Sequence, residues 1–145
     1  MKERFETFTV LISKISRNIR KLKNQEMAEY ELRSTHVSCL YYLYGAESLT
    51  ATELCERCKE DKATISRAID YLETKGYVTC ECKLSKRYNS PIKLTEKGKL
   101  IGKEICDKVD LILDEVGVGL SDEERIEFYR CLTIISDNLE RAAKA

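Results

Sequence analysis

The chain of 145 residues has little of several things that other classes of protein need. It holds one proline and six glycines, which leave little material for long loops. No apolar run approaches the roughly 18 residues that a membrane-spanning helix requires. The first residues, MKERFETF, are charged where a secretory signal would be apolar. These absences favour one helix-rich globular domain, residues 1–145, located in the cytoplasm and away from any membrane.

Histidine is also nearly absent, and this argues against an enzyme. His36 is the only histidine, so the chain has few residues that could serve as the general base of a catalytic nucleophile–base pair. The chain carries no glycine-rich phosphate loop and no paired-carboxylate signature. We therefore expect neither catalytic residues nor a cofactor.

Cysteine, in contrast, is plentiful. Seven is an odd number, which does not suit the disulfide framework of a secreted protein. Without a secretory signal we expect reduced thiols, most of them packed as small core residues.

The formal net charge is zero, but basic residues gather in one segment. Between Lys83 and Lys99 six basic residues stand against one acid, Glu96, whereas from Glu104 to the end eleven acids outnumber five bases. A basic segment in a neutral chain favours local phosphate binding. An ordinary solvated surface is the alternative.

Apolar residues at helical spacing predict long helices at both ends of the chain. The first helix runs to about residue 28, and another follows Thr95 and ends near Gly117. A capping box formed by Ser121 and Glu124 begins the last helix.

The centre of the chain predicts a winged helix-turn-helix. A buried helix is expected at 34–45, and a short helix at 51–58 follows Thr50 as its cap. The next helix, about 62–75, is capped by Asp61 and stopped by Gly76. After it, alternation in YVTCECKL, a turn-rich SKRYNSP and a return strand IKLT predict a β-hairpin. A short helix, a tight turn, a second helix and a hairpin form this motif.

The helix at 62–75 has two different faces. One is an apolar stripe that fixes it to its neighbours, and the other is small, polar and partly cationic. The second face is suited to a DNA major groove, where Arg67 can reach guanine O6 and N7 while Thr64 and Ser66 donate to backbone oxygens. A solvated surface is again the alternative. The candidate DNA-binding residues of this helix are Lys62, Ala63, Thr64, Ser66, Arg67 and Asp70.

Two stretches carry a family resemblance, DKATISRAIDYLETKGYV and LTEKGK. With the surrounding helices, they resemble the MarR family of winged-helix transcriptional regulators over nearly the whole chain. The resemblance implies a mainly α fold with a small β-hairpin, a DNA-binding lobe at 34–99 and dimerisation helices at 1–33 and 100–145. It implies a homodimer that binds an inverted repeat in double-stranded DNA, represses its own operon, and releases DNA on oxidation or on binding a small aromatic ligand.

The wing, about residues 83–93, departs from the family's pattern. Many members carry an Asp-x-Arg triplet there, whose arginine reaches toward the minor groove. The matching positions hold Lys86, Arg87 and Tyr88, so the arginine is displaced by one residue and lysine replaces the acid. We expect the wing to contact phosphate, while minor-groove insertion by Arg87 stays open.

The terminal helices favour a dimer on physical grounds as well. Two long amphipathic helices cannot both bury their stripes against the small central lobe, and a second copy is the economical partner. An intramolecular bundle is the alternative.

The pairs Cys55-x-x-Cys58 and Cys80-x-Cys82 leave three roles open. Four thiolates would suit zinc, a thiol of lowered pKa would suit redox sensing, and packed thiols would be inert. A thiol- or zinc-responsive regulator of the same fold is therefore an alternative.

The resemblance places a ligand cleft near the start of the second helix, where His36 lies. Tyr41 and Tyr44 are further candidates for an aromatic pocket, and purely structural roles are the alternative for all three residues. The rival to DNA binding is a winged-helix protein-interaction module. An acidic or apolar recognition face would favour that module, and the face here is neither.

Overall fold

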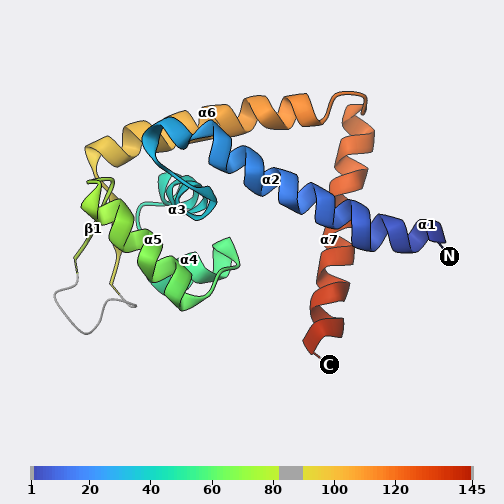
Figure 1. Ribbon diagram of the computed structural model, residues 1–145, viewed down its shortest axis with the longest axis horizontal. Coiled ribbons are helices and arrows are strands. Elements are labelled where there is room, and N and C mark those ends of the chain that lie inside the picture. Colours follow the sequence, from blue (N-terminus) through green and yellow to red (C-terminus); the bar gives the residue numbers. More distant parts are fainter. Residues whose placement is uncertain (1, 82–89, 145) are drawn as a thin grey trace. The chain divides into compact units, whose positions relative to one another are not determined.

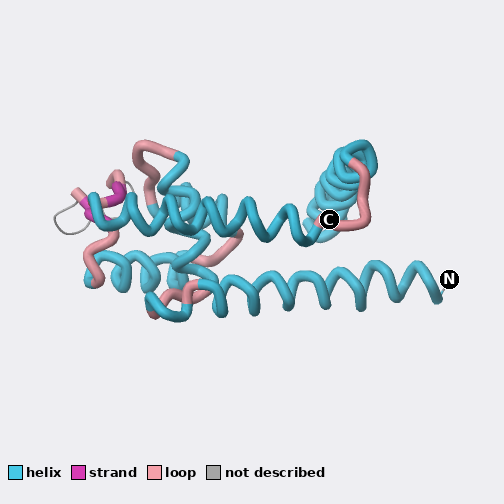
Figure 2. Tube along the Cα trace, turned by 90° about the horizontal axis from the view of Figure 1, so that it is seen from above, coloured by secondary structure: helices cyan, strands magenta, loops and turns pink. Residues whose placement is uncertain are grey.

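A computed structural model describes residues 2–81 and 90–144 of the chain (Figure 1). The chain divides into two compact units, Met1–Asp107 and Lys108–Ala145. Among the described residues, the strands form one short hairpin and nearly all other regular structure is helical (Figure 2). The predicted mainly α fold with a small β-hairpin is therefore confirmed, while the single domain 1–145 stays a prediction.

The first unit begins with one continuous helical run. It consists of α1 (Lys2–Phe5), the π-helical segment η1 (Glu6–Leu11) and α2 (Ile12–Glu26), joined at residues with right-handed helical backbone angles. A 3-10 turn, η2 (Ala28–Tyr30), follows. The long first helix that the apolar spacing predicts is confirmed.

Three helices form the centre of this unit: α3 (Ser34–Gly45), α4 (Ala51–Cys58) and α5 (Lys62–Thr74). A capping box begins α4, because the Thr50 hydroxyl accepts the N–H of Glu53 and the Glu53 carboxylate accepts the N–H of Thr50, both at 3.1 Å. All three helices lie at their predicted positions, and Figure 1 shows them gathered beside the hairpin.

The core of the unit draws on every one of these elements. Leu40 of α3, Leu54 of α4 and both Ile65 and Leu72 of α5 are 0% exposed, as is Ile92 of the hairpin. Burying one such side chain stabilises a fold by about 1.5–3 kcal/mol relative to leaving it in water. The helix-turn-helix is therefore held in place by apolar packing.

The hairpin pairs β1 (Val78–Cys80) with β2 (Ile92–Leu94) in antiparallel register. Leu49 adds a single bridge, in which it and Ile92 exchange N–H···O=C bonds of 3.1 and 2.8 Å. This bridge lies immediately before α4 and ties it to the hairpin. The strand predicted over residues 77–84 extends into residues 82–89, which lie outside the described part.

A clamp at the base of the hairpin begins α6 (Glu96–Val116). The Thr95 hydroxyl donates to the carbonyl of Gly76 at 2.6 Å and accepts the N–H of Gly98 at 3.0 Å. A Cβ at Gly98 would lie 1.9 Å from the carbonyl oxygen of Tyr77. The LTEKG stretch therefore ties the start of α6 to the end of α5.

The second unit contains α7 (Asp122–Lys144). The predicted capping box is present, since Ser121 and Glu124 exchange side-chain-to-backbone hydrogen bonds of 3.0 and 3.1 Å. No residue of α7 is buried, although the helix carries an apolar stripe. Within residues 2–81 and 90–144, no helix has the length and apolar character needed to cross a membrane.

Candidate functional site

The apolar side of α5 is packed into the core of the first unit. Ile65, Ala68, Ile69 and Leu72 are between 0% and 3% exposed, as the apolar stripe predicts. The helix begins at Asp61, whose carboxylate accepts the N–H of Thr64 at 2.7 Å. Hydrogen bonds from Thr64 hold the pKa of Asp61 below its ordinary value, so this cap is charged at neutral pH.

The opposite side of the helix, here named the α5 outer face, faces solvent. It consists of Lys62, Ala63, Thr64, Ser66, Arg67 and Asp70, four of them exposed and two, Thr64 and Ser66, half-buried. The Arg67 guanidinium lies 3.5 Å from the Thr64 hydroxyl. The residues predicted to bind DNA therefore form one surface on a helix whose other side is packed.

Two contacts hold the far end of α5 to the segment that follows the first helix. The Tyr71 hydroxyl donates to the backbone carbonyl of Glu31 at 2.5 Å. Lys75 forms an ion pair of 2.9 Å with the Glu31 carboxylate, and this pair raises the pKa of Lys75 and lowers that of Glu31. Glu31 has a left-handed backbone, with φ of 58°, which turns its carbonyl at the end of η2.

Part of the predicted site falls outside the described residues. Lys86, Arg87 and Tyr88 of the wing lie there, and so does Cys82. Among the described residues of the hairpin, Lys93 on β2 forms an ion pair of 3.5 Å with the Glu81 carboxylate.

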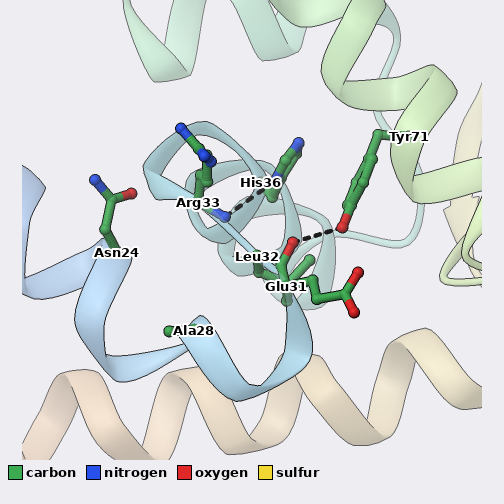
Figure 3. Close-up of a pocket in the computed structure, with 7 residues that line it drawn as sticks. All are labelled: Asn24, Ala28, Glu31, Leu32, Arg33, His36 and Tyr71. Atoms are coloured by element: carbon green, nitrogen blue, oxygen red, sulfur yellow. Dashed lines mark hydrogen bonds between the residues drawn. The ribbon is translucent and has the colours of Figure 1, made fainter.

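His36 lines an open cavity of about 520 Å³ at the start of α3 (Figure 3). Its Nδ1 accepts the N–H of Arg33 at 3.0 Å, which caps the helix. Burial, and then the charge of Arg33, lower the pKa of His36, so the ring is neutral near pH 7. The lining residues are Asn24, Ala28, Glu31, Leu32, Arg33, His36 and Tyr71.

Tyr71 also lines this cavity, although it was not among the ligand-binding residues predicted from the sequence. Its ring stacks on the imidazole of His36, which is 35 positions earlier in the chain. No local pattern signals a contact over that distance, because Tyr71 lies on α5 between the buried stripe and the outer face.

The three residues predicted to bind a ligand, His36, Tyr41 and Tyr44, do not line the same cavity. Tyr44 lines a different open cavity, of about 740 Å³, together with lysines 93, 99 and 103. The ring packs closely against Gly102 of α6, because a Cβ added at Gly102 would lie only 2.9 Å from a ring carbon of Tyr44. Tyr41 is 40% exposed and contacts the ring of Tyr42 edge-on, with centroids 5.5 Å apart.

The cysteines differ from the expectation that most are core residues. Of those described, Cys39 alone is buried, and the other five are partly exposed: Cys55, Cys58, Cys80, Cys106 and Cys131. Within the described residues no three histidine, cysteine or acidic side chains gather as a metal site would require. Cys58 instead pairs with Cys39, a contact that sequence spacing did not indicate.

Residues 30–87 match the sequence model of the MarR family. A relative from Bacillus subtilis, the HTH-type transcriptional regulator YybA, is 27% identical over 133 residues, which cover 90% of this chain and 87% of that protein. These matches are to transcriptional regulators rather than to enzymes, which agrees with the expectation drawn from the scarcity of histidine.

Solved structures share the fold. The S. aureus MepR–DNA complex has a TM-score of 0.81 at 20% identity and covers 91% of this chain and 97% of that chain. The MarR family regulator NMB1585 from Neisseria meningitidis has a TM-score of 0.80 at 18% identity, with coverages of 97% and 96%. Together with the winged helix-turn-helix described above, they show that the chain has the fold of MarR family regulators, and residues 30–87 are similar to that family in sequence.

Proposed function

We propose that the chain is a sequence-specific regulator that binds double-stranded DNA as a homodimer, represses transcription in the cytoplasm, and responds to a small aromatic ligand. The observation that carries this proposal is the α5 outer face. It is polar and partly cationic, on a helix whose opposite face is packed into a core. Such a helix can enter a major groove without disturbing the fold behind it.

Four residues of the α5 outer face have defined roles in this proposal. Arg67 donates two hydrogen bonds to guanine O6 and N7, and Ala63 leaves room for close approach. Lys62 and Thr64, at the N-terminal end of α5, contact phosphate where the helix dipole is positive. The MepR structure with DNA supports DNA as the partner, because that protein has the same fold.

The wing adds contacts to the backbone or minor groove through Lys86, Arg87 and Tyr88. This part of the proposal rests on the sequence alone, because these residues lie outside the described part. Their positive charge suits phosphate.

A second copy of the chain is the proposed partner of the terminal helices. Apolar side chains of the first helical run are largely exposed, with Phe5 at 65% and Ile19 at 50%. On α7, Ile126 is 64% exposed and Leu139 is 57% exposed. Long helices with an uncovered apolar stripe are stabilised by packing against another surface. A two-fold dimer would present two recognition helices to an inverted repeat.

The cavity beside His36 is the proposed ligand site. It offers the ring of Tyr71, the guanidinium of Arg33 and the amide of Asn24. A ligand seated here would disturb the contacts that hold α5 to Glu31, and so would change the position of the α5 outer face. This gives a route from ligand binding to release of DNA.

Fluorescence anisotropy tests the DNA proposal. The probes are a labelled duplex from the region upstream of the chain's own gene and a scrambled duplex of equal composition, each titrated across a salt series. We expect the upstream duplex to bind tighter by about a thousandfold or more, with affinity falling as salt rises. Equal affinity for both duplexes would contradict sequence-specific recognition, and binding to neither would contradict DNA binding.

Thermal unfolding with benzoate tests the ligand site. We expect benzoate to raise the Tm of the native chain and of Tyr71→Phe, which keeps the ring, but not of Tyr71→Ala. Cyclohexanecarboxylate, which has the charge without the aromatic ring, is the control and should shift the Tm less. Equal shifts in all variants would place benzoate elsewhere.

A further inference from the structure

A small cavity of about 140 Å³ lies where α2, the start of α3 and the end of α4 meet. Two hydrogen bonds hold α2 to α3 beside it. The Lys23 ammonium donates to the Ser38 hydroxyl at 3.1 Å. The Ser34 N–H donates to Asn24 Oδ1 at 2.6 Å. The lining residues are Ser16, Ile19, Arg20, Lys23, Ser34, Thr35, Ser38, Cys58 and Glu60.

The helix sides that line this cavity are polar where packed helices are usually apolar. Ser16, Arg20 and Lys23 are spaced by four and then three residues, so they share one side of α2. Ser34 and Ser38, four residues apart, share one side of α3. Helices ordinarily pack through apolar stripes. Packing alone therefore does not account for these hydroxyl and cationic groups.

The charge of the cavity favours an anion. Arg20 and Lys23 line it from α2, and Glu60, just after the end of α4, is the one acid among the lining residues. Within residues 2–81 and 90–144, no ion pair includes Arg20 or Lys23. Lys23 is also half-buried, so its ammonium is only partly hydrated. Both cations are therefore available to a bound anion.

The volume limits the anion to a small one. A water molecule occupies about 30 Å³ in the liquid, so a cavity of about 140 Å³ has room for a molecule of about five heavy atoms. Pockets for drug-sized ligands are larger, at roughly 300–1,000 Å³. Phosphate and sulfate have the right size, and their oxygens accept hydrogen bonds from guanidinium, ammonium and hydroxyl groups. The cavity therefore suits a tetrahedral oxyanion.

Glu60 distinguishes between such oxyanions. Its backbone is held in place, because its N–H donates to the carbonyl of Cys55 at 3.1 Å. A carboxylate only accepts hydrogen bonds, so it favours an anion that still carries a proton. Hydrogen phosphate carries one at neutral pH. Sulfate carries none, and neither does most of a phosphate monoester, whose second pKa is about 6. Glu60 would repel both of these ions.

We propose that this cavity is a binding site for inorganic phosphate. Arg20 and Lys23 neutralise the charge of hydrogen phosphate, the hydroxyl groups of α3 donate to its oxygens, and Glu60 accepts its proton in a hydrogen bond. The ion joins α2 to α3 and so stabilises the folded chain. This site is separate from the α5 outer face and from the cavity beside His36, and it does not depend on the function proposed for either.

Isothermal titration calorimetry of the full chain, purified without phosphate, tests the site. The titrants are sodium phosphate, sodium sulfate and methyl phosphate, at about pH 7.5 and at constant ionic strength so that screening is equal. We expect one phosphate to bind per chain, and the other two ions to bind about tenfold more weakly or less, because they lack the proton that Glu60 accepts. No binding of phosphate, or equal affinity for the three ions, would overturn the proposal.

Substitution of the two cations locates the bound ion. Arg20→Met and Lys23→Met should each weaken phosphate binding about tenfold or more, because each removes a charge-assisted hydrogen bond. Arg17→Met and Lys21→Met are the matched controls, since they remove the same charges from exposed positions of α2 outside the cavity. They should bind phosphate as the native chain does. Equal losses in all four variants would show that phosphate responds to net charge alone, and would overturn the site.

Glu60→Gln tests the selectivity for phosphate. Glutamine keeps the shape of glutamate, carries no charge and can donate through its amide, so sulfate should bind more tightly to this variant than to the native chain. The preference for phosphate over sulfate should fall about tenfold. An unchanged preference would overturn the role of Glu60. These measurements use no DNA and no aromatic ligand, so their outcome does not depend on the proposed function.

Discussion

The ring of Tyr71 stacks on the imidazole of His36, with centroids 4.3 Å apart and an angle of 15° between the ring planes. His36 caps α3 through Nδ1, and Tyr71 holds α5 through its bond to Glu31. The stack therefore joins the start of α3 to α5. Nδ1 can accept the Arg33 N–H only while it carries no proton, so the arrangement requires a neutral imidazole.

The first prediction follows from this requirement. The pKa of His36 lies below its ordinary value of 6.5 in the folded chain. Below pH 6.5 the unfolded chain therefore binds more protons, and the free energy of unfolding should fall as the pH drops toward the lower folded pKa. Above pH 6.5 this contribution is fully present. Urea unfolding at pH 7.5, 6.5 and 5.5 measures it.

His36→Gln is the control for this pH dependence. Glutamine can accept the same N–H through its side-chain oxygen, as in a capping box, but does not titrate. Because His36 is the only histidine, the variant should lose most of the slope between pH 6.5 and 5.5. An unchanged slope in His36→Gln would assign the effect to carboxylates instead.

The second prediction concerns Gly98. A Cβ there would overlap the Tyr77 carbonyl oxygen, a backbone atom that cannot rotate away. We expect Gly98→Ala to lower the free energy of unfolding by about 1–3 kcal/mol, although alanine favours helix. Gly45→Ala is the matched control, because no atom lies within 4 Å of its Cβ, and it should be neutral or stabilising by up to about 1 kcal/mol. Equal stability of the two variants would contradict the clamp.

Local signals explain why so much of the fold was predictable from the sequence. Thr50, Asp61 and Ser121 each cap the helix expected of them, and their bonds span only three residues. The alternation of buried and exposed positions on α5 likewise depends on residues within one helix. Local patterns of this kind are specified by neighbours in the chain.

The contacts around the candidate sites join residues that are far apart in the chain. Tyr71 meets His36, and Cys58 meets Cys39, only after α3, α4 and α5 pack together. The spacing Cys55-x-x-Cys58 had instead suggested that Cys58 acts together with Cys55. Pairing across helices depends on their packing, which periodicity does not encode.

The third prediction is dimerisation. Sedimentation equilibrium at micromolar concentration should give a mass near twice 16.7 kDa. Leu132→Glu places a charge in the exposed apolar stripe of α7 and should favour the monomer, while Thr133→Glu places the same charge on another side of the helix and should not. A monomer from the native chain would contradict the proposed interface.

The last prediction separates base reading from positioning. Arg67→Ala should cost roughly 1–3 kcal/mol per contact on the matched duplex and relax sequence preference at one position in each half-site. Lys86→Ala or Arg87→Ala should weaken binding to every sequence and reduce the salt slope by about one per lost phosphate contact. Because a dimer presents each residue twice, both losses should appear nearly doubled, on half-sites about one helical turn apart.

Anisotropy on matched and scrambled duplexes across a salt series distinguishes these effects, with Arg141→Ala as a control that removes the same charge from α7. If Arg67→Ala lowers affinity equally for both duplexes, Arg67 contacts phosphate and the proposed base contact is wrong. If it matches Arg141→Ala on both, the α5 outer face does not bind DNA. A loss confined to the matched duplex, with an unchanged salt slope, is the result that base reading requires, because a contact to guanine N7 and O6 neutralises no phosphate.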